Sequence, residues 1–204
     1  MTYPSFFDTV PSIELEDKLG GFLGAFGDSS VEISYLDCVK LSGHSCPTVA
    51  SAYLMALIGL EALYGGEVPQ RSQIKLSVAQ SKDDGVTGVI ANVIAYIIGA
   101  NDEGGFKGIG GQMSRNNLIS YNDTQIDGTF SLTRLDSGKT VSMSSTTAVV
   151  PGSPEMMPLM QKSMQGTATD AEQERFRELW QGRVESMLLD RDLWQKIVTI
   201  KIEE

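Results

Sequence analysis

The sequence predicts an α+β fold, with a mixed or antiparallel sheet and buried helices in one core domain and a helical C-terminal extension. Two observations predict it. Apolar segments with helical spacing are interspersed with short alternating segments, and several strand-like segments come late in the chain, close to one long amphipathic helix. A length of 204 residues favours one core domain with an appendage. We therefore expect a core over residues 1–150 and a helical extension with a terminal strand over 151–204.

The first two elements are predicted to be a helix and a strand. Leu15, Leu19 and Phe22 recur at helical spacing and predict an amphipathic helix over 12–26. The alternating sequence over 31–35 predicts a strand that leads directly into the next motif.

Two buried helices are predicted in the middle of the chain. Pro47 suits the first turn of a helix, and the segment from there to Leu63 is apolar nearly all round, which is typical of a buried helix. Alternation predicts a strand over 73–79, and the apolar segment 86–100 predicts a second buried helix.

The second half begins with a glycine-rich loop over 101–116. Strand-like runs follow at 118–121, 128–135 and 140–144, and the turn between the last two predicts an antiparallel hairpin. Prolines indicate a connector over 151–158. The capping box of Thr169 and Glu172 predicts a long helix that ends near residue 189. A final strand over 197–202 closes the sheet or pairs with a partner chain.

Composition narrows the function classes. The net charge is −10 and no basic patch is present, which argues against nucleic acid or an anionic membrane surface as a partner. The N-terminus lacks the pattern of a signal peptide, and the longest apolar runs are interrupted, so we expect a soluble, cytoplasmic protein. Its two cysteines do not resemble a secreted disulfide framework.

Both cysteines and the only histidine, Cys38, His44 and Cys46, fall within nine residues. Thiolate and imidazole are preferred zinc ligands, and they also form nucleophile and base pairs. Cys46 lies at the start of a predicted helix, where the helix dipole favours the thiolate. Cys38 supplies a third ligand if the loop folds back, or it is simply a small buried apolar side chain.

Two protein ligands are fewer than zinc sites usually have. The remaining ligands would be carboxylates, water, substrate or a second subunit, and Asp37, Asp83 and Asp84 are the candidate carboxylates. The loop over 104–111 lacks a dinucleotide or Walker motif and is interpreted as a lid or turn. Arg115 either places a cation near an anionic substrate or is an ordinary surface arginine.

The motif Gly43-His-Ser-Cys-Pro47, followed by a small apolar helix, resembles the Gly-His-x-Cys-Pro signature of the formylmethanofuran dehydrogenase FmdE family. The later run from Gly110 to Leu118 resembles a second motif of that family, and the resemblance covers roughly residues 30–145. It implies an α+β core, pairing as a dimer and a metal-binding active site at His44 and Cys46. Other cysteines typical of the family align with Gly85 and Gly111, where this chain departs from the pattern.

Three hypotheses follow. The leading one is a dimeric FmdE-like protein that binds a transition metal, with zinc favoured, through His44 and Cys46. Cys38 is a further candidate ligand. The metal would serve metal-assisted or redox chemistry on a small molecule. The second is a metal-free enzyme with Cys46 as nucleophile and His44 as base. The third is a non-catalytic metal-handling or partner-docking protein that uses its C-terminal helix.

Overall fold

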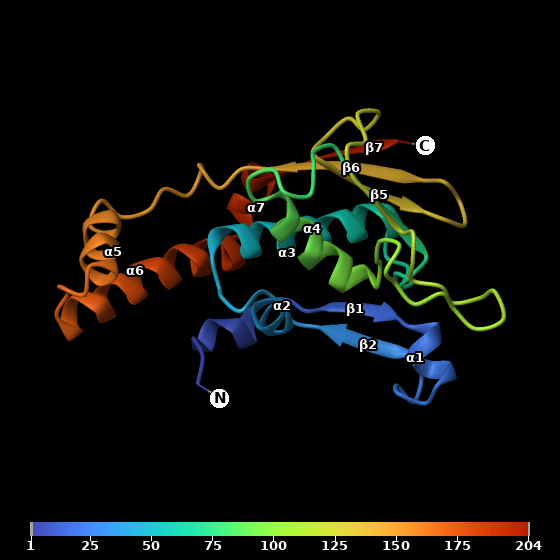
Figure 1. Ribbon diagram of the computed structural model, residues 1–204, viewed down its shortest axis with the longest axis horizontal. Coiled ribbons are helices and arrows are strands. Elements are labelled where there is room, and N and C mark those ends of the chain that lie inside the picture. Colours follow the sequence, from blue (N-terminus) through green and yellow to red (C-terminus); the bar gives the residue numbers. More distant parts are fainter. Residues whose placement is uncertain (1, 204) are drawn as a thin grey trace.

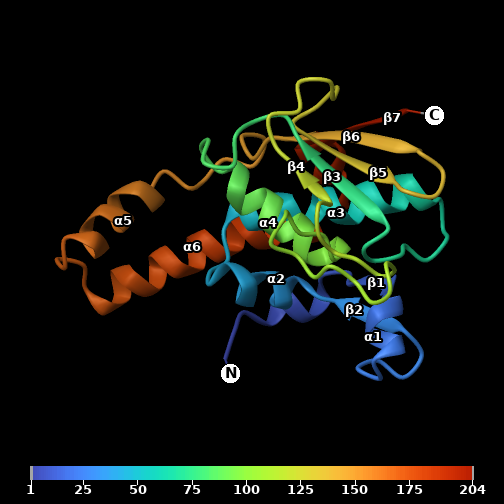
Figure 2. The ribbon, with the colours of Figure 1, turned by 45° about the vertical axis from the view of Figure 1, so that its right-hand side comes forward.

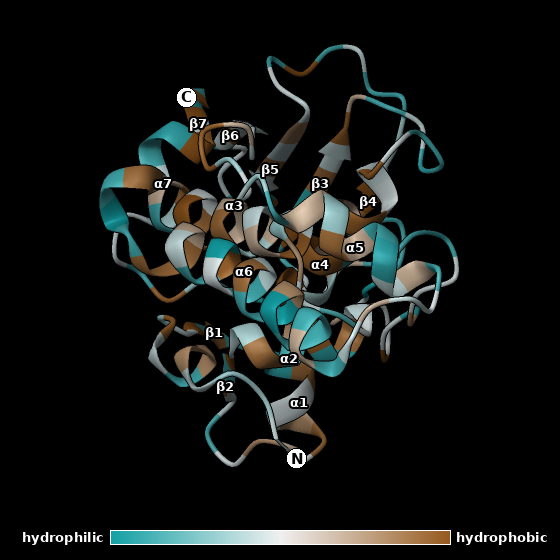
Figure 3. Ribbon diagram, turned by 90° about the vertical axis from the view of Figure 1, so that its left-hand side faces the viewer, coloured by the Kyte–Doolittle hydropathy of each residue, from teal (hydrophilic) through white to brown (hydrophobic). Residues whose placement is uncertain are grey.

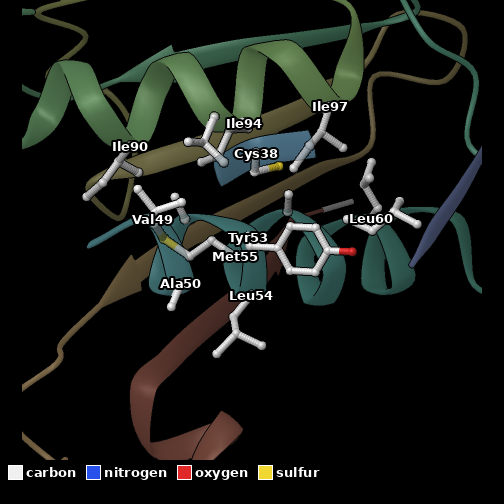
Figure 4. Packing of buried hydrophobic residues seen from close by; sticks show 14 of the residues in the cluster. Cys38, Val49, Ala50, Tyr53, Leu54, Met55, Leu60, Ile90, Ile94 and Ile97 are labelled. Atoms are coloured by element: carbon white, nitrogen blue, oxygen red, sulfur yellow. The ribbon is translucent and has the colours of Figure 1, made fainter. Parts of the chain in front are cut away.

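Two buried helices form the centre of the molecule. The computed structural model describes residues 2–203 and places α3 (Pro47–Tyr64) beside α4 (Thr87–Ile98). Both predicted buried helices are confirmed. Figure 4 shows the apolar side chains of the two helices packed against one another. By length and composition α3 could span a membrane, but 67% of it is buried inside the fold, as expected of a core helix.

The main sheet covers one side of these helices. Its strands are β3 (Ile74–Val78), β4 (Ile119–Ser120), β5 (Phe130–Arg134), β6 (Thr140–Ser145) and β7 (Val198–Glu203). They are arranged in the order β4-β3-β5-β6-β7, with β3 and β4 parallel and every other pair antiparallel. The sheet is therefore mixed, the predicted β5–β6 hairpin is confirmed, and the last strand closes one edge of the sheet.

The N-terminal segment differs from its prediction. After a 3-10 turn, η1 (Ser5–Thr9), the chain forms β1 (Ile13–Glu16), a short helix α1 (Lys18–Phe22) and β2 (Ser30–Ile33). β1 and β2 pair as a separate antiparallel sheet. The helix predicted over 12–26 is wrong, because Ile13 and Leu15 alternate toward the core while Phe22 remains 65% exposed.

A helix that was not predicted from the sequence follows β2. This helix, α2 (Tyr35–Ser42), begins with a capping box between Ser34 and Asp37 and ends at Gly43 in a left-handed conformation with φ of +74°. The predicted strand over 31–35 therefore ends at Ile33. Cys38 lies on a helix and not in a loop.

The C-terminal part forms a helical arm and then rejoins the core. A helix that was not predicted, α5 (Met156–Met164), begins within the predicted connector and packs along α6 (Asp170–Leu189). The short helix α7 (Arg191–Ile197) then leads into β7. The capping box at the start of α6 is confirmed. Figure 3 shows mixed polar and apolar residues along α6, whereas α3 is mostly apolar. The proposed division at residue 150 stays a prediction.

These elements are arranged in three layers. In Figure 1 the main sheet lies above α3 and α4, and the β1–β2 sheet and α2 lie below them. The paired helices α5 and α6 extend away from the layers on the left, and Figure 2 shows the same arrangement from a second direction. The α+β class predicted from the sequence is confirmed.

Candidate functional site

His44 is exposed on the short loop between α2 and α3. Its Nδ1 lies 2.9 Å from the carbonyl oxygen of Ser42. Because a carbonyl oxygen only accepts hydrogen bonds, Nδ1 carries the hydrogen, and Nε2 of the neutral ring keeps its lone pair. The backbone thus fixes the tautomer in which His44 offers Nε2 as a metal ligand or a base.

Cys46 occupies the N-cap of α3. Its Sγ accepts a hydrogen bond of 3.5 Å from the backbone N–H of Val49, and Pro47 follows in the first turn as predicted. The cysteine is 8% exposed and belongs to the hydrophobic cluster. The sequence therefore places its sulfur at the positive end of a buried helix, with little access to solvent.

Cys38 lies elsewhere. It is fully buried on α2, and Figure 4 shows it among apolar side chains of α3 and α4. Burial, with the neighbouring charge of Asp37 as a smaller cause, raises the pKa of the Cys38 thiol to about 12. Its role as a third metal ligand stays a prediction, and packing in the core favours a neutral thiol at physiological pH.

A cleft of about 690 Å³ opens beside His44. The C-terminal end of α2 forms one wall, α4 forms another, and residues that follow α4 and surround β4 form the third. This volume is within the usual range for small-molecule sites. His44 lines the cleft, while Cys46 is not among the described residues that line it.

A buried ion network forms part of the cleft. Asp17 is 1% exposed and accepts hydrogen bonds from Arg71 (2.8 Å), from Nη2 of Arg115 (2.6 and 2.7 Å) and from the backbone of Gly20 (2.9 Å). Burial by itself would raise the pKa of the Asp17 carboxyl. The hydrogen bond from Gly20 and the two arginines outweigh burial, and they hold the pKa below its ordinary value.

The two arginines in this network are bound differently. Arg71 also donates to the carbonyl oxygens of Tyr96 and Ile97 at the C-terminal end of α4, so each of its nitrogens has an acceptor. Among the residues that the structure describes, the guanidinium of Arg115 donates only through Nη2. Its Nε is buried without a hydrogen-bond partner among the described residues. Arg71 is consequently a structural residue, while Arg115 has donors to spare.

The glycine-rich loop holds Arg115 at the cleft. Backbone hydrogen bonds join Arg115 to Asn101 and Phe106, each at 2.8 Å. A Cβ on Gly105 would lie 2.8 Å from both the carbonyl oxygen of Arg115 and the Cα of Asn116, so only glycine permits this approach. The glycine-rich loop, for which the sequence predicts a lid or turn, thus supports Arg115 through backbone hydrogen bonds.

The arm helix α6 also contacts the motif. The indole N–H of Trp180 donates a hydrogen bond of 2.9 Å to the carbonyl oxygen of Ser45. The hydroxyl of Ser45 lies 3.0 Å from Gln181 Oε1 and 3.0 Å from the Tyr35 hydroxyl. Nothing in the sequence pattern indicates that Trp180 and Gln181 belong beside the site. Together these bonds fix the position of the loop that carries His44.

The donor set for a metal is small in one chain. No group of three or more His, Cys, Asp or Glu side chains within residues 2–203 is arranged to hold a metal ion. Asp37 is used in the capping box of α2, while Asp83 and Asp84 lie on an exposed turn. His44 and Cys46 stay the candidate ligands, and a metal held by them would need further ligands from outside the chain.

Comparison with known proteins identifies the family. The model of the family described as "FmdE, Molybdenum formylmethanofuran dehydrogenase operon" matches residues 41–193, which is more than half of the chain. The match begins just before the His44 motif and extends through α6 to α7. None of the curated proteins compared with the chain matches it. The chain therefore belongs to the FmdE family.

Proposed function

We propose that this FmdE-family protein binds a transition metal, with zinc favoured, through His44 and Cys46. The observation that supports the proposal is the bond between His44 Nδ1 and the Ser42 carbonyl, which leaves Nε2 available beside the cleft. Imidazole and thiolate are ligands that zinc prefers, and Cys46 follows His44 by two residues at the N-terminus of α3. When bound, such an ion acts as a Lewis acid or activates water.

The cleft beside His44 would hold the small molecule on which this chemistry acts. The residues of the chain orient His44 through Ser42 and keep its loop in place through Trp180. The remaining ligands would come from substrate, water or a second copy of the chain, because His44 and Cys46 are fewer ligands than a zinc site usually has. We therefore also propose a homodimer. Both cysteines are free, which suits a reducing compartment, so we place the proposed function in the cytoplasm.

The test is the metal content per chain, measured by mass spectrometry on protein purified without chelator. Wild type should carry nearly one metal ion, and His44→Ala and Cys46→Ser should each lose it. Cys38→Ser is the matched thiol control, because it removes the other cysteine. Retained metal in that variant would limit the cysteine ligands to Cys46. X-ray absorption should then show a sulfur neighbour at about 2.3 Å from zinc.

Two other results would contradict the proposal. Wild-type protein that contains no metal, and binds none when zinc is added back, excludes a metal site. If iodoacetamide then modifies Cys46 much faster than Cys38 at neutral pH, the cysteine-nucleophile alternative is favoured. Light scattering of the purified protein tests the dimer, with and without zinc, and a monomer in both conditions would refute it.

A further inference from the structure

We propose that the cleft is a binding site for small carboxylate monoanions, with Arg115 as the residue that recognises the carboxylate. The inference deepens the proposed function, on which it rests for the cleft being the substrate site, because it names the chemical class of the substrate. It depends on the charge balance of the cleft, on the N–H donors of Arg115 that have no acceptor among the described residues, and on the apolar character of the other lining side chains.

The charge balance is positive in an otherwise acidic protein. Three cations, Arg71, Lys82 and Arg115, line the cleft, and two carboxylates, Asp17 and Asp102, pair with them. One positive charge is left over, although the whole chain has a net charge of −10. A surplus of one charge suits a monoanion better than a phosphate dianion, because the low dielectric of a cleft strengthens each unbalanced charge.

Arg115 is the cation in the cleft that can bind a ligand directly. Arg71 has acceptors for all its nitrogens, and Lys82 is exposed and lies 3.4 Å from Asp102. Arg115 shares Asp17 with Arg71 and bonds it through one nitrogen only. Its Nη1 has no acceptor among the described residues, and its Nε is buried without one. Asp17 therefore leaves part of the guanidinium without an acceptor among the described residues, and Nη1 is the donor that can turn to a ligand.

Nη1 of Arg115 is the donor that a carboxylate in the cleft would meet, because Nη2 already binds Asp17 and Nε is buried. A bond from the charged guanidinium to a carboxylate oxygen is charge-assisted, and such bonds are roughly twice as strong as neutral ones. The side chain of Arg115 is 20% exposed, so a molecule in the cleft can reach it. The bonded glycine-rich loop keeps it at this position in the absence of ligand.

The other walls suit an organic body attached to the carboxylate. Val89, Ile119 and the rings of Tyr96 and Tyr121 provide apolar surface. Neither tyrosine hydroxyl bonds to any residue that the structure describes, so both are available to a polar substituent. Asn92 is exposed at the edge of the cleft, and its side chain likewise has no hydrogen bond within residues 2–203. The lining thus combines one cationic anchor with apolar walls, and small-molecule sites are commonly built from apolar surface with a few polar groups.

The experiment titrates benzoate into chelator-treated protein and follows ¹H–¹⁵N chemical shifts. Benzamide is the matched probe, because it has nearly the same shape and no charge. Benzoate should bind about tenfold tighter or more, as expected for one charged hydrogen-bond pair, and it should shift amides around the cleft. Arg115→Gln should abolish the preference, and Arg115→Lys should keep part of it. Arg177→Gln, which removes an exposed charge on α6, is the matched control and should bind as wild type does.

A second variant guards against misfolding of Arg115→Gln. Asn92→Asp adds a negative charge at the exposed edge of the cleft and leaves the Asp17 network intact, so it should weaken benzoate binding and leave benzamide binding unchanged. Equal binding of the two probes to wild type would overturn the inference, as would an unchanged preference in Arg115→Gln. Because the titrated protein is stripped of metal, failure of zinc binding and failure of carboxylate binding are separate results.

Discussion

Asp17→Asn tests whether the buried ion network holds the cleft together. The substitution keeps the size of the side chain and removes its charge. Arg71 and Arg115 would then be two neighbouring cations without an anion, at a site where Asp17 is 1% exposed. The backbone bond from Gly20 can still be accepted by an asparagine oxygen, so the loss concerns the charge and not the N-cap of α1.

The size of the effect follows from these contacts. Each hydrogen bond to a charged group contributes about 1.5–3 kcal/mol, and Asp17 binds two arginines. Removal of one partner from a buried ion pair typically costs about 3–5 kcal/mol. We expect the free energy of unfolding to fall by about 3–5 kcal/mol, which is a large part of the roughly 5–15 kcal/mol that stabilises a typical domain.

Urea unfolding at pH 7 measures this loss of stability as a lower midpoint concentration of urea, with an unchanged dependence of the unfolding free energy on urea. Asp136→Asn is the control, because it breaks an exposed pair with Arg134 and should have a much smaller effect. Adding Arg115→Gln to Asp17→Asn should restore part of the lost stability by removing one of the two unpaired cations. A loss below about 1 kcal/mol in Asp17→Asn would refute the network as a major source of stability.

Three further predictions concern stability. The pKa of Asp17 is lowered in the folded state, so its charge stabilises the fold fully above about pH 4, the ordinary range of an aspartate pKa. This stabilisation is lost as the pH falls through the pKa of Asp17 in the folded protein. Acid titration of the unfolding free energy of wild type and Asp17→Asn measures the difference. Gly59→Ala places a Cβ against the Met143 sulfur, and such overpacking should cost about 1–3 kcal/mol. This cost should exceed the roughly 1 kcal/mol by which alanine favours a helix over glycine, so thermal unfolding should show a less stable protein. Trp180→Phe removes the bond to Ser45 and should cost about 0.5–1.5 kcal/mol, with faster hydrogen exchange in the motif loop.

Each of these has its own control. If the stability of wild type and that of Asp17→Asn fall in parallel as the pH is lowered, the Asp17 charge does not contribute to the pH dependence. Gly182→Ala on α6 should stabilise the protein, because a Cβ there meets no atom within 4 Å, and equal effects at Gly59 and Gly182 would contradict the packing argument. Unchanged exchange of the residue 43–46 amides in Trp180→Phe would show that α6 does not hold the loop.

The sequence predicts the elements whose local signals agree. Both core helices, the β5–β6 hairpin and α6 have unambiguous periodicity, a turn or a capping box, and all are observed. Residues 12–26 are wrongly predicted because their apolar residues fit both a helical and an alternating period. Pairing with β2 selects the strand at Ile13–Glu16. The capping box of Ser34 and Asp37 is a readable signal for α2, but the alternating residues before it favour a longer strand.

The site is predictable only in part. The motif places His44 and Cys46 at the start of α3 because Pro47 and the apolar helix are local features. Asp17 meets Arg71 across 54 positions and Arg115 across 98, so no local pattern reveals the network or the cleft. The burial of Cys38 likewise depends on helix packing, which a window of nine residues does not contain.

The bond between Trp180 and the Ser45 carbonyl also has a consequence for the order of folding. It joins residues 135 positions apart, and closing so long a loop costs conformational entropy that local helix formation does not. We therefore expect the core helices to form from local contacts first, and the loop that carries His44 to reach its final position after α6 docks. A refolding experiment on a Trp194→Phe variant, in which Trp180 is the remaining tryptophan, should therefore detect helix formation by circular dichroism before the fluorescence reaches its native value.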